Sequence, residues 1–186
     1  MQNGIAQIVE KHPLIPVVTI NQIDEVDYIA KKLITKSIGC VEVTLRTNVS
    51  WEAIALFKQK YGDRLSIGVG TVTASHDVDL CVKSQVDFIV SPGTSQELNE
   101  AMLNSGIPFL PGVSTPSEII TGIGYGWGFM KFFPAHLFGG LKALKVYHSL
   151  FKEIKFCPTG GINANNYQDY LELKNVIAVG GSWLTA

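Results

Sequence analysis

The chain has 186 residues, of which 46% are hydrophobic and 17% are charged, and its formal net charge is −1. This length and apolar content predict a single domain, residues 1–186, with a sizeable core. The near-zero net charge argues against the broad positive field that nucleic acid or anionic lipid would attract, so we expect no nucleic-acid or membrane partner.

The cysteines and the N-terminus indicate the cellular compartment in which the protein is expected. Cys40, Cys81 and Cys157 lie far apart and form no CxxC or CxxH pair, which argues against a structural zinc site, and we expect no metal. Unpaired thiols are typical of a reducing compartment. No apolar run approaches the ~20 residues that span a bilayer, and the polar start MQNGIAQIVEKH lacks the apolar region of a signal peptide. We therefore expect a soluble, cytoplasmic protein.

Short apolar runs alternate with longer amphipathic segments along the chain. The runs predict eight strands, over Leu14–Ile20, Cys40–Leu45, Leu65–Gly70, Phe88–Ser91, Pro108–Pro111, Phe129–Phe133, Lys155–Thr159 and Val176–Val179. The segments between them predict seven helices, over Ile23–Ser37, Ser50–Tyr61, Ser75–Ser84, Ser95–Ser105, Thr115–Gly122, Gly140–Phe151 and Asn163–Leu173. N-cap residues begin several of these helices, and glycine follows others, as at Gly62, Gly106 and Gly122.

This alternation predicts an α/β protein built from parallel βα units. Eight strands with seven connecting helices fit a (β/α)8 TIM barrel whose final helix is missing or lies outside this sequence. A doubly wound open sheet is the alternative, but it usually has fewer strands.

The second predicted strand carries charges on one face. Val41 and Val43 alternate with Glu42, Thr44 and Arg46, so the polar set is expected to point into the barrel while the apolar set packs on the helices. Glu42 and Arg46 could form a structural ion pair. The place of Arg46 near the end of the strand, where barrels carry their chemistry, favours anion binding instead.

Two glycine pairs follow the last two predicted strands, in Thr159-Gly-Gly-Ile162 and Val179-Gly-Gly-Ser-Trp183. TIM barrels place a phosphate site at these loops, where glycines let backbone N–H groups approach the ligand. Ordinary glycine turns are the alternative. The run Gly122–Gly128 is glycine-rich too, but it follows a helix and precedes a strand, the reverse of a dinucleotide-binding loop.

One lysine, Lys131, lies in the apolar strand FMKFF. It either reaches solvent from the strand end or is a functional amine, whose neutral form the neighbouring Phe129, Phe132 and Phe133 would favour.

Seven motifs in this order resemble those of 2-keto-3-deoxy-6-phosphogluconate aldolase, a class I aldolase similar to 4-hydroxy-2-oxoglutarate aldolases and to the galactonate-derived counterpart. They are EVTLRT (Glu42–Thr47), GVGTV (Gly68–Val72), SPG (Ser91–Gly93), PGVST (Pro111–Thr115), KFFPA (Lys131–Ala135), CPTGGI (Cys157–Ile162) and GGSW (Gly180–Trp183). The resemblance implies a (β/α)8 fold, a cytosolic homotrimer, a small-molecule phosphorylated keto acid as substrate, and neither metal nor cofactor. Family members continue past GGSW into a further helix, whereas this sequence ends at Ala186.

The resemblance also implies residue roles. Lys131 would form a Schiff base with the substrate, and Glu42 would shuttle protons. Arg46 and Thr71 would hold the substrate carboxylate, and Pro92 and Phe133 would line the pocket. The phosphate would be bound by Gly160, Gly161, Gly180, Gly181 and Ser182.

Two other classes of function remain open. A non-covalent phosphate-binding barrel, such as an isomerase or decarboxylase, would keep the glycine pairs and give Lys131 only an electrostatic role. A non-catalytic binding protein would keep Arg46 and the glycine pairs without needing Glu42. The presence of Lys131, Glu42 and Arg46 together favours the aldolase.

Overall fold

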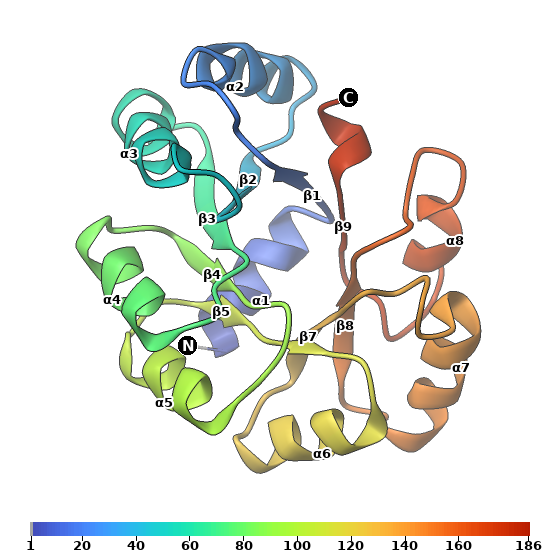
Figure 1. The fold of residues 1–186 in the computed structure, drawn as a ribbon. Coiled ribbons are helices and arrows are strands. Elements are labelled where there is room, and N and C mark those ends of the chain that lie inside the picture. The colour runs from blue at the N-terminus through green and yellow to red at the C-terminus, as the bar shows by residue number, and fades with distance from the viewer. Residues whose placement is uncertain (1) are drawn as a thin grey trace.

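The computed structural model describes residues 2–186, in which parallel strands form a central barrel and helices surround it (Figure 1). Within these residues the strands are β1 (Leu14–Val18), β2 (Cys40–Thr44), β3 (Ser66–Gly70), β4 (Phe88–Val90), β5 (Phe109–Leu110), β6 (Gly112–Val113), β7 (Phe129–Phe132), β8 (Lys155–Pro158) and β9 (Val179–Gly181). The helices are α1 (Gln2–Lys11), α2 (Glu25–Thr35), α3 (Ser50–Tyr61), α4 (Ser75–Lys83), α5 (Gln96–Asn104), α6 (Pro116–Gly124), α7 (Gly140–Leu150) and α8 (Tyr167–Leu171).

The strands form a six-stranded sheet in the order β5-β4-β3-β2-β1-β9 and a three-stranded sheet in the order β6-β7-β8. Two links join the sheets into one ring. Strand β5 lies within the fifth predicted strand, Pro108–Pro111, and β6 follows directly after Pro111, where a proline supplies no N–H to a ladder. Isolated bridges pair Phe156 with Val176 and Thr159 with Gly180, which connects β8 to β9. The predicted TIM-barrel class is therefore confirmed.

Alternation along the strands produces two apolar layers. Val41, Val43, Met130 and Phe132 pack in the layer between the sheet and the surrounding helices. A smaller cluster fills the inside of the barrel and includes Ile15, Cys40, Phe88, Val90, Leu110, Cys157 and Ala178. The period of two in β2 thus turns Glu42 and Thr44 inward, as the sequence predicted.

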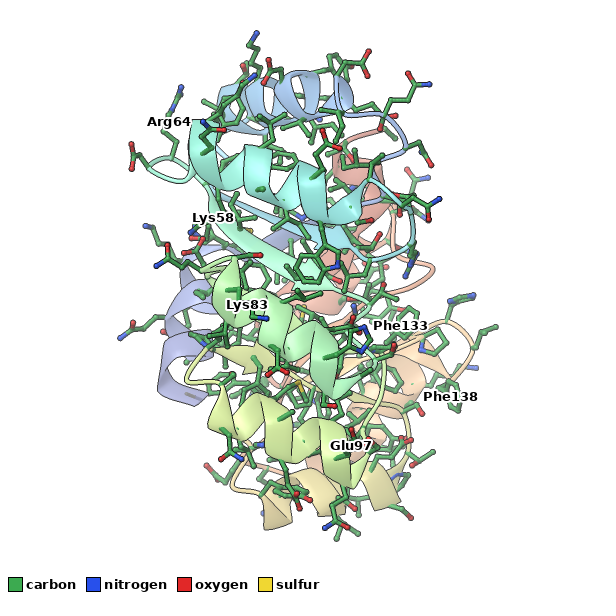
Figure 2. The ribbon with its side chains drawn as sticks, turned by 60° about the vertical axis from the view of Figure 1, so that its left-hand side comes forward. Lys58, Arg64, Lys83, Glu97, Phe133 and Phe138 are labelled. Carbon is green, nitrogen blue, oxygen red and sulfur yellow. The ribbon has the colours of Figure 1, made fainter. Side chains whose placement is uncertain are left out.

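Helix α1 was not predicted; half of its residues are polar. Ile5 and Val9 lie one helical turn apart, are fully buried, and join the cluster inside the barrel. Figure 2 shows α1 at the end of the barrel opposite Phe133. This helix therefore covers the N-terminal end of the barrel and leaves the other end, where the strands finish, open for a ligand.

Several predicted boundaries are wrong for local reasons. Strand β9 begins at Val179, so Gly180 and Gly181 lie within the strand and not in a loop after it. Helix α8 is much shorter than the predicted Asn163–Leu173, because Asn163 and Asn166 side chains accept hydrogen bonds from the backbone N–H groups of Asn165 and Asn163. Such bonds compete with helix formation. Helix α6 continues past the predicted end at Gly122.

After β9 the chain forms a 3-10 helix, Ser182–Leu184, which lies between α2 and α8 at the rim of the barrel (Figure 1). None of the helices in residues 2–186 has the length and apolar character needed to cross a membrane.

Candidate active site

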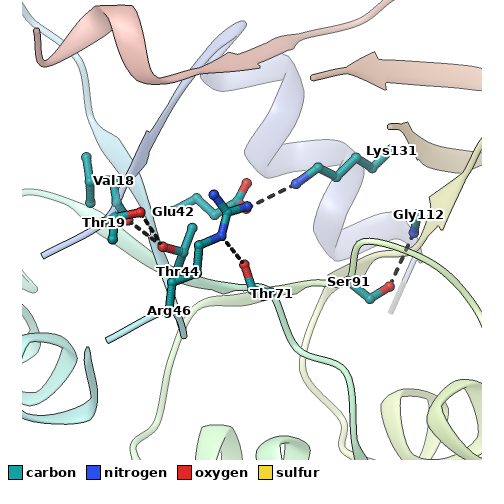
Figure 3. A network of polar contacts seen from close by, with 9 residues as sticks. All are labelled: Val18, Thr19, Glu42, Thr44, Arg46, Thr71, Ser91, Gly112 and Lys131. Carbon is teal, nitrogen blue, oxygen red and sulfur yellow. Dashed lines mark hydrogen bonds and ion pairs between the residues drawn. The ribbon is translucent and has the colours of Figure 1, made fainter. Parts of the chain in front are cut away.

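Strands β2 and β7 bring a buried acid and a buried amine together inside the barrel. Lys131 Nζ lies 3.1 Å from Oε1 of Glu42, and the two residues are only 5% and 3% exposed. Figure 3 shows the two side chains extended toward each other from opposite sides of the barrel. Lys131 therefore does not reach solvent from the strand end. Its charge is met by a carboxylate inside the fold.

The ring of Phe133 and the backbone of Gly70 lie next to this pair. The ring of Phe133 has its centre 5.1 Å from Lys131 Nζ, close enough for a cation–π contact. Phe132, predicted to surround the amine, instead packs edge-on against Tyr147 and Phe156 outside the barrel, because consecutive strand residues point to opposite faces. Gly70 lies beside Glu42, and a Cβ there would collide with its carboxylate.

Arg46, just past the end of β2, donates from Nε to Oγ1 of Thr71 at 3.1 Å (Figure 3). Thr71 has a φ of 63°, which is rare for a β-branched residue. Strained backbone of this kind persists only where the surroundings enforce it, and it gathers at functional sites. In this conformation the Thr71 hydroxyl accepts the hydrogen bond from Arg46 and holds the guanidinium at the end of β2.

A cavity of about 610 Å³ opens at this end of the barrel. The predicted site residues that line it are Arg46, Phe133, Gly160, Gly161, Gly181 and Ser182. Gly180 does not line it; it pairs with Ile15 in the sheet and lies against the Thr159 side chain.

The first glycine pair has the backbone of an anion site. Gly160 and Gly161 have φ values of 96° and 74°, which glycine adopts without steric cost. The isolated bridge between Thr159 and Gly180 connects the start of this turn to β9. Both glycines line the cavity, and successive glycine N–H groups in a turn of this kind are suited to bind an anion.

Pro92 does not line this cavity. It borders a separate hollow of about 220 Å³, together with Val72, Gly93 and Leu98. Its neighbour Ser91 is fully buried, and the Ser91 hydroxyl accepts a hydrogen bond of 3.2 Å from the N–H of Gly112. Gly112 pairs with Lys131 across β6 and β7, so this loop supports the strand that carries the amine.

Cys157 pairs with Lys131 across β8 and β7 but is not an alternative nucleophile. Burial raises the pKa of its thiol to about 12, and a protonated thiol is a poor nucleophile. Among residues 2–186, no three His, Cys, Asp or Glu side chains are grouped so that they could hold a metal ion.

Comparison with known proteins identifies the family. The sequence profile of the KDPG and KHG aldolases matches residues 5–186. The 2-dehydro-3-deoxy-phosphogluconate aldolase of Dickeya dadantii is 43% identical over 178 residues, which cover 96% of this chain and 83% of the relative. The chain belongs to the KDPG and KHG aldolase family.

Other members of the family agree in sequence and fold. The KHG/KDPG aldolase of Escherichia coli K12 is 38% identical over 172 residues, which cover 92% of this chain and 80% of the relative. KDPG aldolase from Legionella pneumophila, solved with pyruvate captured as a covalent carbinolamine intermediate, superposes with a TM-score of 0.93 at 41% identity, covering 96% of this chain and 86% of that one. The predictions of the family and of a carbon–carbon lyase are confirmed, and neither the isomerase or decarboxylase nor the binding protein receives support.

Two threonines at the cavity were not singled out from the sequence. Thr159 lines the cavity beside Gly160, and its hydroxyl faces Gly180 so closely that a Cβ there would lie 2.5 Å from it. Thr19 lines the cavity just after β1. The same sequence pattern could have identified both threonines, because each is a polar residue at the carboxyl end of an apolar run in a predicted barrel.

Proposed function

We propose that this chain is a class I aldolase that cleaves 2-keto-3-deoxy-6-phosphogluconate into pyruvate and glyceraldehyde 3-phosphate through a Schiff base on Lys131. The observation that carries the proposal is the buried contact of 3.1 Å between Lys131 Nζ and Glu42 Oε1. A Schiff-base nucleophile needs a neutral amine next to a group that moves protons. The solved relative with pyruvate captured covalently supports the same chemistry.

The pair can generate that amine without an outside base. Two opposite charges are costly inside a protein, and transfer of one proton from Nζ to Oε1 leaves both groups neutral. The free amine then attacks C2 of the keto acid, and loss of water forms the iminium. The protonated Glu42 is positioned to give its proton to the departing hydroxyl.

Bond cleavage uses the carboxylate again. Glu42 takes the proton of the C4 hydroxyl, the C3–C4 bond breaks, and its electron pair enters the iminium to form an enamine. Glyceraldehyde 3-phosphate leaves as the aldehyde. Protonation of the enamine at C3 and addition of water to the imine release pyruvate and restore the amine. In this scheme one buried carboxylate serves as both the acid and the base.

The two ends of the substrate are bound by different parts of the rim. Arg46, held by Thr71, would bind the carboxylate of the pyruvyl end. The N–H groups of Gly160 and Gly161, with the Ser182 hydroxyl on the same cavity, would bind the phosphate. Gly181 would let the backbone approach, and Gly180 would act only by shaping β9 beside Thr159. Pro92 would support the pocket from behind, through its loop.

The proposed oligomeric state and cellular location are those that the resemblance to the aldolase family implies. We place the enzyme in the cytoplasm because Cys40, Cys81 and Cys157 are all unpaired thiols. We propose a homotrimer, and large exposed apolar side chains, among them Leu137 and Phe138, support assembly because contact between copies would cover them. Figure 2 shows Phe138 at the same end of the barrel as Phe133.

Borohydride trapping tests the central step. The protein is incubated with pyruvate and reduced, and its intact mass and peptide map are measured. We expect one pyruvate adduct, on Lys131. Lys131→Arg should give no adduct, since a guanidinium does not form the imine. Lys155→Arg is the matched control, because Lys155 lies on the neighbouring strand but reaches the Lys174 carbonyl at the exposed surface. An adduct at another lysine, or none, would refute the mechanism.

The second candidate substrate is 4-hydroxy-2-oxoglutarate, which is favoured by the name of the E. coli relative. It lacks the phosphate, so the relative kcat/KM of the two keto acids separates the candidates.

A further inference from the structure

Thr19 lines the cavity and takes no part in the mechanism above. Its hydroxyl lies 2.8 Å from the hydroxyl of Thr44, which is fully buried on β2. Thr44 in turn donates its hydroxyl proton to the carbonyl oxygen of Val18 at 3.1 Å. Figure 3 shows these three groups close together beside Arg46.

This arrangement fixes the direction of the Thr19 hydroxyl. A hydroxyl has one proton to donate, and that of Thr44 is engaged by Val18. The proton in the contact between the two threonines therefore comes from Thr19. Thr19 is left with oxygen lone pairs and no proton for a ligand, so toward the cavity it is an acceptor of hydrogen bonds only.

The order of the strands places this acceptor between the two ends of the substrate. Strand β1 lies between β9 and β2 in the sheet. The proposed phosphate site lies on the β9 side, with Ser182, and the proposed carboxylate site lies on the β2 side, with Arg46. A ligand that joins these two sites passes the position of Thr19 with its middle carbon atoms.

We propose that Thr19 is a specificity-determining residue that accepts a hydrogen bond from the C5 hydroxyl of the substrate, an inference that rests on the proposed function. The keto acid carries two free hydroxyls, at C4 and C5. The C4 hydroxyl gives its proton to Glu42, which leaves the C5 hydroxyl, one carbon nearer the phosphate, as the donor for Thr19. The same lone pairs repel a carboxylate, so Thr19 also disfavours 4-hydroxy-2-oxoglutarate.

The test runs the reaction in the direction of bond formation. Pyruvate is combined with D-glyceraldehyde 3-phosphate, or with 3-oxopropyl phosphate, the same aldehyde without the hydroxyl that becomes C5. The readout is the ratio of the two kcat/KM values. In the unmodified protein we expect the hydroxylated aldehyde to be preferred. Thr19→Val should reduce that preference by about 2- to 10-fold, the range of one neutral hydrogen bond.

Two variants separate this role from a structural one. Thr19→Ser keeps the hydroxyl and should keep the preference. Thr35→Val is the matched control, because the Thr35 hydroxyl is exposed on α2 and bonds only its own helix, at the Lys31 carbonyl. The preference should be unchanged in this control.

The possible outcomes separate the role of Thr19 from the aldolase activity on which that role rests. If Thr19→Val adds pyruvate to both aldehydes with the unmodified preference, the role of Thr19 is refuted and the aldolase stands. If Thr19→Ser loses the preference as fully as Thr19→Val, the hydroxyl is not the determinant and the inference is again refuted. If the unmodified protein forms no product from either aldehyde, the proposed function fails, and the inference fails with it.

Discussion

Lys131 and Glu42 are 89 residues apart in sequence, yet their side chains form a contact of 3.1 Å from β7 and β2 inside the barrel. Removing either partner would leave the other buried without its counter-charge, which typically costs about 3–5 kcal/mol. A pair of this kind is weak evidence for stability, since apolar residues would fill the same space at lower cost. The pair lies beside Phe133, which lines the cavity. We therefore explain the buried pair by its proposed role in catalysis and not by a gain in stability.

Glu42→Gln tests the proton transfers. The amide oxygen can still accept a hydrogen bond from Lys131, but it does not take up a proton. We expect turnover of the phosphorylated keto acid to fall by about 10²–10⁴, the usual contribution of a general base. Steady-state kinetics and a thermal melt measure the two effects separately. Normal turnover in a folded variant would return Glu42 to a purely structural ion pair.

Gly70→Ala tests the placement of Glu42 without changing either charged group. The added Cβ would meet the Glu42 carboxylate, which must then move away from Lys131. We expect kcat to fall by at least about tenfold, as small displacements of catalytic groups are costly. Gly93→Ala is the control, because a Cβ there meets nothing within 4 Å. Equal kcat in the two variants would show that the position of the carboxylate is not critical.

Thr71→Gly separates stability from binding. Glycine adopts the positive φ of this position freely, so relief of strain should raise the free energy of unfolding by about 1 kcal/mol. The same change removes the acceptor that holds Arg46 Nε. We expect kcat/KM to fall by about tenfold. Chemical denaturation measures the change in the free energy of unfolding, and steady-state kinetics measures the change in kcat/KM. A less stable variant with unchanged kcat/KM would contradict both parts, and Thr71→Ser should behave like the unmodified protein.

The phosphate site predicts a preference between keto acids. Charge-assisted bonds contribute about 1.5–3 kcal/mol each, so loss of two or three should cost on the order of 10²-fold or more in kcat/KM. The phosphorylated six-carbon acid should therefore be cleaved well ahead of 4-hydroxy-2-oxoglutarate. Ser182→Ala should narrow that gap and leave pyruvate trapping on Lys131 intact. Comparable kcat/KM values in the unmodified protein would favour the shorter acid as substrate.

Glu118 gives a pH-dependent prediction away from the site. Burial tends to raise its pKa, but the backbone and hydroxyl groups of Ser114 and Thr115 hydrogen-bond the carboxylate and lower the pKa overall. A group with a lowered folded-state pKa stabilises the fold above its unfolded pKa, and this contribution disappears as the pH falls through the folded pKa.

Glu118→Ala should therefore lower the free energy of unfolding by about 1 kcal/mol at pH 7, the scale of a lost capping box. The difference from the unmodified protein should shrink as the pH falls below the unfolded carboxyl value of about 4.3. Unfolding by denaturant at several pH values measures this trend. Glu153→Ala, on an exposed turn, is the control. A difference that persists at the lowest pH would show that packing, and not charge, is responsible.

The sequence by itself determined the class of fold and singled out Lys131 and Glu42 as candidate site residues. The alternation of apolar runs and amphipathic segments predicted the barrel, since strand and helix periods are written in a few adjacent residues. The period of two in β2 placed Glu42 and Thr44 on the inner face. The glycine pairs and the lysine in FMKFF indicated candidate site residues, because each feature is unusual within its own short segment.

Only the tertiary structure decided which of these residues meet. Closure of the ring brings β2 opposite β7, which pairs Glu42 with Lys131, and it puts β1 between β9 and β2, which places Thr19 at the cavity. It also places α1, half of whose residues are polar, on the inner cluster through Ile5 and Val9. These contacts join segments far apart along the chain, and no local pattern contains them, because they depend on how the whole sheet curves and closes.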